Sequence, residues 1–246
     1  MKMEILAVIP ARGGSKGIPR KNLVMLGDKP LVAHTICAAL NSKFISRVVV
    51  STEDDEIAEV SHRWGADIPF LRPAELAKDD VHSADVVWDT LKQLSSLNYN
   101  PEIVIMMLPT APLRLSWHVD EAIHMFSEED CQSVIGVCEL KQYLGQIRQI
   151  QHGYLRPIEM SGDNNTSSIA QARLRNTQRQ DQEPLYYPNG SIYVADTQTF
   201  LLNRSFHLPR TLPYLMPSTN GIDVDTPEDL ELVEYLYKRA NTINML

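Results

Sequence analysis

The sequence has few cysteines and no long hydrophobic run. Its three cysteines, Cys37, Cys131 and Cys138, lack the paired spacing of a zinc site. They therefore indicate small apolar residues in a reducing compartment. No stretch approaches the ~20 apolar residues of a membrane-spanning helix, and Pro10 and Arg12 interrupt the short apolar run near the N-terminus, which argues against a signal peptide. We expect a cytoplasmic protein that does not bind a membrane.

The chain also lacks an excess of positive charge, and its seven histidines show no metal-ligand spacing. Its formal net charge is -8, from 23 Lys and Arg residues against 31 Asp and Glu residues. This balance argues against a nucleic-acid-binding protein, and it makes any local basic cluster informative. With 246 residues, 43% of them hydrophobic, the chain is long enough for one sizeable core.

Apolar segments alternate along the chain with amphipathic ones. Strands are expected at 4–9, 47–52, 102–108, 133–138 and 191–196, and helices at 30–40, 52–64, 82–95 and 116–126. The expected helix starts are Pro30 in a first turn, and Thr52, Ser116 and Thr226 as N-caps. The alternation predicts an α/β fold with a mainly parallel sheet. Because residues 145–190 are polar and poor in core-forming residues, we expect one domain over 1–246 with an inserted arm at about 140–190.

The turn after the first strand, "VIPARGGSKGIPRKNL" (8–23), contains no acidic residue. It is not a dinucleotide fingerprint, because Arg12 stands at the first glycine position, and it lacks the Gly-Lys-Ser/Thr order of a P-loop. Glycines that can take φ > 0 bring backbone N–H groups close to phosphate oxygens, and cations and hydroxyls add further donors. The candidates are Gly13, Gly14, Arg12, Ser15, Lys16 and Lys21, with Arg20 expected at the surface. The pattern favours an anion site, with an exposed turn of solvated charges as the alternative.

Two carboxylates in "Asp223-Val224-Asp225" point to the same side if this segment is extended. Such a pair can hold Mg²⁺ together with phosphate oxygens and water. The alternative is that Asp225 belongs to the start of the following helix and Asp223 is merely exposed.

Other polar residues allow two interpretations each. Arg72 can bind a planar polar group with both arms of its guanidinium, or pair with Glu75 at the surface. Thr110 in "LPTAPLR" offers a hydroxyl or belongs only to a structural turn, and Arg114 is expected to anchor that loop. The pair Asn189-Gly190 predicts a tight turn before the strand at 191.

Five segments carry a family resemblance: "IPARGGSKGIPRKNL", "VVVSTEDDEIAEVSHRWGADIPFLRPAELAKDD", "LPTAPLR", "RQDQEPLYYPNGSIYVAD" and "GIDVDTPEDLELVEYL". In this order they resemble the acylneuraminate cytidylyltransferases, also called CMP-sialic acid synthetases. The resemblance implies a Rossmann-like nucleotidyltransferase fold, with helices on both faces of the sheet and an inserted dimerisation arm. It also implies the transfer of CMP from CTP to the anomeric hydroxyl of a nonulosonic acid, with Mg²⁺ as cofactor and release of pyrophosphate. A homodimer is implied, in which the arm of one subunit completes the site of its partner.

The resemblance also implies roles for individual positions. It places Arg12, Ser15, Lys16 and Lys21 around the triphosphate, Asn22, Arg72 and Ser83 around the cytidine, Arg179 and Tyr193 at the sugar acid, and Asp223 and Asp225 at the metal. Thr110 is a further candidate for the nucleotide and Asn189 for the sugar. Lys21, Asp223 and Asp225 would be the catalytic residues.

Two positions depart from the family pattern. Leu108 stands where the family usually has glutamine, and Gly145 stands near the position of a lysine. Both lie on the sugar side, so the sequence predicts cytidylyl transfer and leaves the acid open. N-acetylneuraminate and legionaminic acid are the main candidates, with pseudaminic acid behind them. A Kdo cytidylyltransferase and a non-catalytic nucleotide-binding homologue are the alternative functions.

Overall fold

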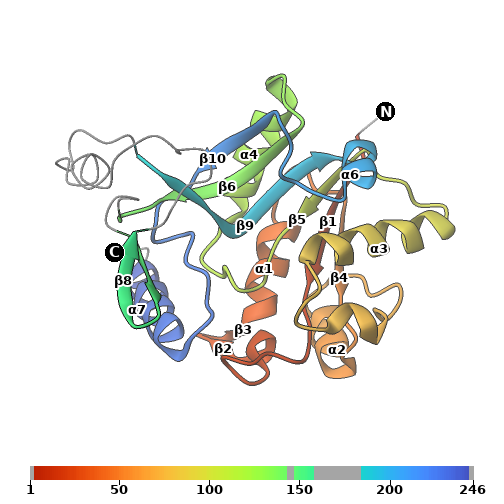
Figure 1. Cartoon of the computed structure of the whole chain (residues 1–246). Coiled ribbons are helices and arrows are strands. Elements are labelled where there is room, and N and C mark those ends of the chain that lie inside the picture. Colours follow the sequence, from red (N-terminus) through yellow and green to blue (C-terminus); the bar gives the residue numbers. More distant parts are fainter. Residues whose placement is uncertain (1–2, 143–146, 158–183, 244–246) are drawn as a thin grey trace. The chain divides into compact units, whose positions relative to one another are not determined.

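The computed structural model of the chain describes residues 3–142, 147–157 and 184–243 (Figure 1). The chain divides into two compact units. The first comprises residues 1–138 and 188–246, and the second comprises residues 139–187. The candidate site residues fall in the first unit, except Arg179, which lies outside the described residues, as does Gly145.

A six-stranded sheet forms the centre of the first unit, with the strand order β10-β6-β9-β5-β1-β4. The bounds are β1 Ile5–Pro10, β4 Arg47–Ser51, β5 Ile103–Met106, β6 Ser133–Glu139, β9 Tyr186–Asp196 and β10 Thr211–Leu215. β1 pairs in parallel with β4 and β5, β10 pairs in parallel with β6, and β9 is antiparallel to β5. The predicted α/β fold with a mainly parallel sheet is confirmed.

Helices cover both faces of this sheet, as Figure 1 shows. Their bounds are α1 Leu31–Leu40, α2 Asp55–Arg63, α3 Ser83–Ser96, α4 Ser116–Glu128 and α6 Thr197–Asn203. Successive strand residues point to opposite faces, so Ala7 and Ile9 pack with α1, α2 and α4, whereas Leu6 and Val8 pack with α3 and α6. β1 is therefore buried on both faces, as its continuous apolar run predicts.

The last helix, α7 Pro227–Ile243, packs on the segment that follows β1. That segment contains the short elements η1 Lys21–Leu23, β2 Met25–Leu26 and β3 Lys29–Pro30. Thr226 Oγ1 accepts a hydrogen bond from Asp229 N at 3.2 Å, and Asp229 Oδ2 accepts one from Thr226 N at 2.8 Å. This reciprocal capping box confirms the expected start of the helix. It also fixes the residues just before the helix, where the two predicted metal ligands lie.

Two other helix starts differ from the expectation. Pro30 is the N-cap of α1, which begins at Leu31. Asp54, and not Thr52, caps α2, because its Oδ1 accepts a hydrogen bond from Ile57 N at 3.0 Å. A carboxylate at the N-cap satisfies a free N–H and also interacts favourably with the positive end of the helix.

The expected cap of α4 is wrong as well. Ser116 is the first helical residue, and Leu115 is the N-cap. The ring of His118 replaces the usual capping side chain, because its Nδ1 accepts a hydrogen bond from Leu115 N at 3.0 Å. A histidine three residues after the cap gives no recognised sequence signal for a helix start.

The expected tight turn at Asn189-Gly190 is wrong, because β9 continues through both residues. Gly190 has a φ of +74°, and a Cβ there would lie 3.2 Å from Leu108 Cδ1. The pair that often makes a hairpin turn therefore makes a local irregularity inside a strand, which is a known use of glycine. β10 was not expected from the sequence. Pro213 lies within it and is tolerated because β10 is an edge strand.

The second unit contains an antiparallel hairpin of β7 Arg148–Gln151 and β8 Tyr154–Pro157. Its turn is formed by His152 and Gly153, both with positive φ. The N–H of Leu140 donates to the carbonyl of Leu185 at 2.7 Å, which joins the two ends of the unit. The predicted role of this segment in a dimer stays a prediction.

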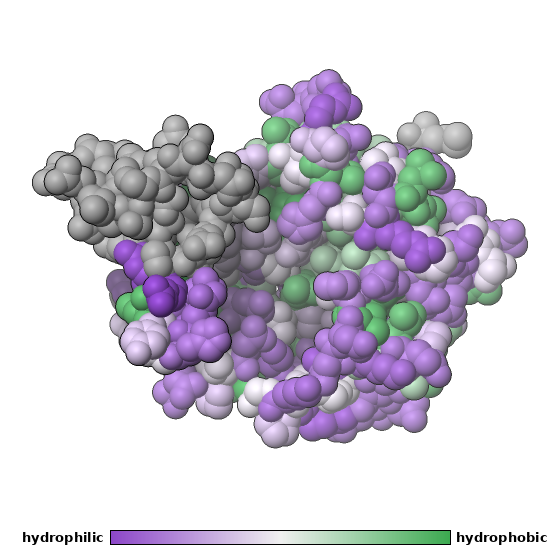
Figure 2. Space-filling model, viewed as in Figure 1, coloured by the Kyte–Doolittle hydropathy of each residue, from purple (hydrophilic) through white to green (hydrophobic). Residues whose placement is uncertain are grey.

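The face of the molecule drawn in Figure 2 is mostly hydrophilic, with hydrophobic residues in small groups. Within the described part of the chain, no helix combines the length and apolar character that a membrane span requires.

Candidate functional site

The loop after β1 carries two cations that lie against one carboxylate. Arg12 Nη1 is 2.8 Å from Asp79 Oδ1, and Lys16 Nζ is 2.6 Å from Asp79 Oδ2. The hydrogen bond from Lys16 is the largest of the effects that lower the pKa of Asp79. The Lys16 side chain is 80% exposed, so solvent screens this pair strongly. Asp79 thus holds the two cations close together, and an anion of higher charge can replace it. Asp79 was not among the residues predicted for the site.

Two glycines of this loop, Gly13 and Gly17, lie so close to other residues that a side chain would not fit. Gly13 and Gly14 do not have positive φ, so the left-handed backbone expected of them is wrong, and Gly17 does not have positive φ either. A Cβ on Gly13 would lie 2.5 Å from Asp54 Oδ2, and one on Gly17 would lie 2.2 Å from the carbonyl oxygen of Asp225. A Cβ on Gly14 would meet nothing within 4 Å. Space is therefore the reason for glycine at positions 13 and 17.

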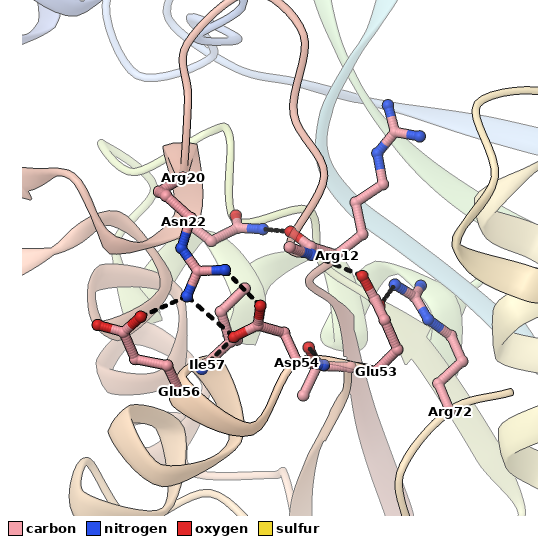
Figure 3. A network of polar contacts seen from close by, with 10 residues as sticks. Arg12, Arg20, Asn22, Glu53, Asp54, Glu56, Ile57 and Arg72 are labelled. Atoms are coloured by element: carbon pink, nitrogen blue, oxygen red, sulfur yellow. Dashed lines mark hydrogen bonds and ion pairs between the residues drawn. The ribbon is translucent and has the colours of Figure 1, made fainter. Parts of the chain in front are cut away.

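Arg20 holds the far end of the loop, as Figure 3 shows. Its guanidinium pairs with Asp54 through both terminal nitrogens and with Glu56 at 2.5 Å. The hydrogen bond from Arg20 is the main effect that lowers the pKa of Asp54. Arg20 was expected at the surface, and its side chain is 42% exposed, but it also pairs with Asp54, the N-cap of α2. The loop is therefore tied to the start of α2.

Arg72 is buried, with 5% of its surface exposed, beside Glu53 (Figure 3). Arg72 Nη2 donates to Glu53 Oε2 at 2.5 Å, and Gly13 N donates to Glu53 Oε1 at 2.7 Å. Burial alone would raise the pKa of Glu53, but these two hydrogen bonds bring it below its usual value. The partner of Arg72 is therefore Glu53 and not Glu75. Glu53, which the sequence did not single out, links the loop after β1 to Arg72, which was predicted to hold the cytidine.

Asn22 lies on the inner side of the same loop. Its Nδ2 donates to the carbonyl of Arg12 at 2.8 Å. Asn22 Oδ1 and Arg72 Nε are both buried without a hydrogen-bond partner. Buried polar atoms without partners are uncommon, so these two groups mark a place where a polar ligand is suited.

Lys21 connects the loop after β1 to the segment that contains Asp223 and Asp225. Its Nζ donates to Asp225 Oδ1 at 2.8 Å and to the carbonyl of Val224 at 2.7 Å. Val224 is fully buried, and its N–H donates to the carbonyl of Thr110 at 2.7 Å. Burial raises the pKa of Asp223, while a side-chain hydrogen bond with Thr110 opposes this effect. Three segments far apart in sequence therefore meet around the two aspartates.

A pocket of 460 Å³ brings most of the predicted site residues together. Its lining includes Arg12, Ser15, Lys16, Lys21, Asn22, Arg72, Ser83, Thr110, Asp223 and Asp225. It lies at the carboxyl ends of β1 and β5, where open α/β sheets usually bind ligands. Gly13 and Gly14 are not part of its lining.

Of the residues predicted at the sugar acid, Asn189 and Tyr193 are described, and neither lines this pocket. Asn189 is 1% exposed, and its Nδ2 lies 3.3 Å from both Cys138 Sγ and Met216 Sδ, so it packs in the core. Tyr193 is 9% exposed, and burial first, then the nearby charge of Asp223, raises its pKa. Leu108 lines the pocket and gives it an apolar wall where the resemblance leads us to expect a polar side chain.

The expected anchoring role of Arg114 is confirmed. Its side chain is buried, and Nη1 donates to the carbonyl of Ser191 at 2.6 Å, while Nη2 donates to Thr35 Oγ1 at 2.5 Å. Both nitrogens also reach the carbonyl of Leu108. The loop that carries Thr110 is therefore attached to β9 and α1.

The donor set fits Mg²⁺ that is bound jointly with a nucleotide. Asp223 and Asp225 face the same pocket as the loop cations. The described residues contain no group of three or more His, Cys, Asp or Glu side chains arranged to hold a metal. Mg²⁺ characteristically uses one or two carboxylates, with phosphate oxygens and water as its other ligands.

Comparisons with known proteins agree over almost the whole chain. A family model described as cytidylyltransferase matches residues 6–240. An N-acylneuraminate cytidylyltransferase from Streptococcus agalactiae serotype III is 34% identical over 239 residues, which are 96% of this chain and 54% of the streptococcal protein. The chain therefore spans about half the length of this relative.

Two shorter relatives are matched along nearly their full length. A CMP-N,N'-diacetyllegionaminic acid synthase from Legionella pneumophila is 35% identical, with 95% of this chain and 96% of the relative covered. A pseudaminic acid cytidylyltransferase from Campylobacter jejuni is 31% identical, with 96% and 97% covered. A solved structure of CMP:2-keto-3-deoxy-manno-octonic acid synthetase complexed with CTP shares the fold, with a TM-score of 0.66, 17% identity, and 96% of this chain and 99% of the other covered.

Proposed function

Because this chain belongs to the cytidylyltransferase family, we propose that it transfers CMP from CTP to the anomeric hydroxyl of a nonulosonic acid and releases pyrophosphate. The observation that carries the proposal is the 460 Å³ pocket, where the loop cations Arg12, Lys16 and Lys21 face Asp223 and Asp225. N-acetylneuraminate and legionaminic acid are the first candidates for the acceptor.

The nucleotide side of the pocket supplies cations for the phosphates of CTP and a fixed guanidinium for its base. Arg12 and Lys16 exchange the carboxylate of Asp79 for phosphate oxygens, which carry more charge and accept stronger hydrogen bonds. Ser15 adds a hydroxyl donor to the same end of the pocket. Arg72, held in place by Glu53, serves the cytosine end. A planar guanidinium that is already fixed loses little entropy when it binds a planar base.

The transfer step brings like charges together. The anomeric hydroxyl attacks the α-phosphorus while the bond to the departing pyrophosphate breaks, so catalysis depends on positioning and on charge neutralisation. Lys21 is 12% exposed and fixed by two hydrogen bonds, and it places a positive charge beside this phosphorus. We propose Asp223 and Asp225 as the ligands of Mg²⁺, which when bound neutralises phosphate charge and orients the leaving group.

The test uses CTP, Mg²⁺ and a panel of acids: N-acetylneuraminate, legionaminic acid, pseudaminic acid and Kdo. Pyrophosphate release is expected with at least one nonulosonic acid, and the panel identifies which. Release with Kdo alone would support the alternative Kdo transfer. If CTP binds measurably but no acid leads to pyrophosphate release, the result would support the alternative of a non-catalytic nucleotide-binding homologue.

Asp225→Asn tests the carboxylate pair. The Asp225 side chain is 71% exposed, so the variant should fold, and we expect turnover to fall at least a hundredfold. Asp130→Asn is the matched control, because Asp130 is also exposed in the first unit and pairs with Arg210. Near-normal turnover of Asp225→Asn would remove Asp225 from the metal site.

We further propose a homodimer to which residues 139–187 contribute. The supporting observation is that Ile150, Tyr154 and Leu155 of the β7–β8 hairpin are 76%, 68% and 71% exposed, and a partner would bury such apolar side chains. Replacing Ile150 and Leu155 by serine should shift the mass measured by light scattering to that of a monomer. Leu202→Ser, at an 85% exposed leucine of α6, is the control that should leave the mass unchanged.

We also propose that the protein works in the cytoplasm. Cys37, Cys131 and Cys138 are all free thiols, which fits a reducing compartment.

A further inference from the structure

A second pocket lies in the first unit, bounded by α1, residues 112–117, residues 219–220 and α7. Its volume is 760 Å³, and none of its described lining residues also lines the 460 Å³ pocket. Sites for small organic molecules measure about 300–1,000 Å³. We call it the α1–α7 pocket. The proposed cytidylyl transfer makes no use of it.

Among the described residues, the lining of the α1–α7 pocket includes basic side chains and no acidic one. Asp28, outside the lining, lies 3.7 Å from Lys29 Nζ. Lys29 and Arg239 contribute from β3 and α7. Arg114 is only 2% exposed. Its terminal nitrogens donate hydrogen bonds to uncharged oxygen atoms, and its Nε is buried without a hydrogen-bond partner. Burial lowers the pKa of Arg114 to about 9. The hydrogen-bond acceptors of its terminal nitrogens are backbone carbonyls and a hydroxyl, and none of them is a carboxylate. The pocket offers an anion a favourable electrostatic environment.

An aromatic surface lies beside these cations. Trp117 is 48% exposed, and its indole stacks on the ring of His118 at 3.7 Å between centroids. Leu115, also in the lining, is 50% exposed. A tryptophan held by stacking and open to solvent presents a rigid flat surface to a ring system.

We propose that the α1–α7 pocket binds a small aromatic anion, with the ring system against Trp117 and the anionic group toward Arg239 and Lys29, and that its occupancy changes the affinity of the nucleotide pocket. A carboxylate, sulfonate or phosphate on a ring system of two or three rings fits both the volume and the charge. The ligand is defined by these chemical properties and belongs to no step of the proposed reaction.

Two hydrogen-bonded segments connect the two pockets. Arg114 lines the α1–α7 pocket and donates to the carbonyl of Leu108, at the wall of the nucleotide pocket. Asn220, also in the α1–α7 lining, donates through Nδ2 to the carbonyl of Leu113 at 3.0 Å. These segments continue to Thr110 and Asp223, which line the nucleotide pocket. A ligand that moves either segment therefore changes the geometry around the nucleotide.

The first experiment measures binding by fluorescence, with two probes that share one ring system and differ by a sulfonate group. 1-Anilinonaphthalene-8-sulfonate is the anionic probe, and N-phenyl-1-naphthylamine is its uncharged counterpart. We expect Arg239→Gln to weaken the anionic probe about fivefold and to leave the neutral probe unchanged. Trp117→Ala should weaken both probes about tenfold. Arg63→Gln is the matched control, an exposed arginine of α2 that pairs with Glu59, and it should change neither.

Either of two results would contradict the proposed binding site. One is the same affinity for the anionic probe in the wild type, Arg239→Gln and Trp117→Ala. The other is equal affinity of the wild type for the two probes. Circular dichroism verifies that each variant is folded, which the exposure of both side chains favours.

The second experiment measures coupling and rests on the proposed nucleotide site, whereas the first does not. Calorimetric titration with CTP should give a dissociation constant that changes at least threefold when the anionic probe is saturating. In Trp117→Ala the same probe concentration should have no effect on CTP binding. An unchanged CTP affinity in the probe-bound wild type would overturn the coupling, and a failure to bind CTP at all would instead count against the proposed function.

Discussion

Replacing Gly17 by alanine adds one methyl group to the loop that follows β1. The new Cβ would lie 2.2 Å from the carbonyl oxygen of Asp225, whereas ordinary contacts begin at 3.4 Å. Either the loop or the segment of the paired aspartates must therefore move by about 1 Å or more, and a displacement of this size at a catalytic site lowers the rate on the order of a hundredfold. That factor corresponds to about 2.7 kcal/mol of transition-state stabilisation.

Gly14→Ala is the matched control, because a Cβ at that position would meet nothing within 4 Å. Both variants receive the same gain in unfolded-state rigidity, since each replaces glycine by alanine in one loop. The assay is steady-state pyrophosphate release at saturating CTP, with thermal unfolding measured in parallel. Equal activity of Gly17→Ala and Gly14→Ala would refute the argument that position 17 requires space for Asp225.

Three further predictions concern charged and titratable groups. Glu53→Gln leaves the buried Arg72 without its counterion, so the free energy of unfolding should fall by about 3 kcal/mol in urea titrations, and an unchanged value would contradict a buried pair. Asp79→Asn frees the cations of the loop, and CTP should bind about threefold more tightly by calorimetry; weaker binding would argue against displacement of Asp79 by phosphate. Burial lowers the pKa of His118 from 6.5 to about 4, and protonation would also remove the acceptor for Leu115 N. The folded state therefore binds this proton less well, so stability should be complete above about pH 6.5 and fall by up to about 3 kcal/mol toward pH 4, an acid loss that His118→Gln should reduce.

Much of the fold follows from local patterns in the sequence. The continuous apolar run of β1 predicts a strand that is covered on both faces, and the structure places helices on both. Thr226 was expected as the N-cap of α7, and its reciprocal hydrogen bonds with Asp229 confirm that start. The antiparallel direction of β9 and the presence of β10 were not foreseen. Strand direction and edge pairing depend on how distant segments pack, and no local pattern encodes them.

The candidate site likewise contains residues that the sequence predicted and residues that only the fold brings into it. Lys21 and the two aspartates were predicted from motifs, yet their meeting depends on a hydrogen bond between residues 204 positions apart. Glu53 and Asp79 were missed, because an acidic side chain near a helix or in a surface loop is ordinary in sequence. Only the fold shows that each lies against a cation of the loop.

The sequence by itself determined the alternation of strands and helices, the basic loop after the first strand and the carboxylate pair before the last helix. Each of these rests on the chemistry of neighbouring residues, which periodicity and turn composition express directly. The tertiary structure alone decided which carboxylate holds each cation, why Gly17 has no side chain, and that basic residues and Trp117 line a second pocket. These properties arise where segments distant in the chain come into contact, and such contacts depend on packing and burial that no single segment specifies.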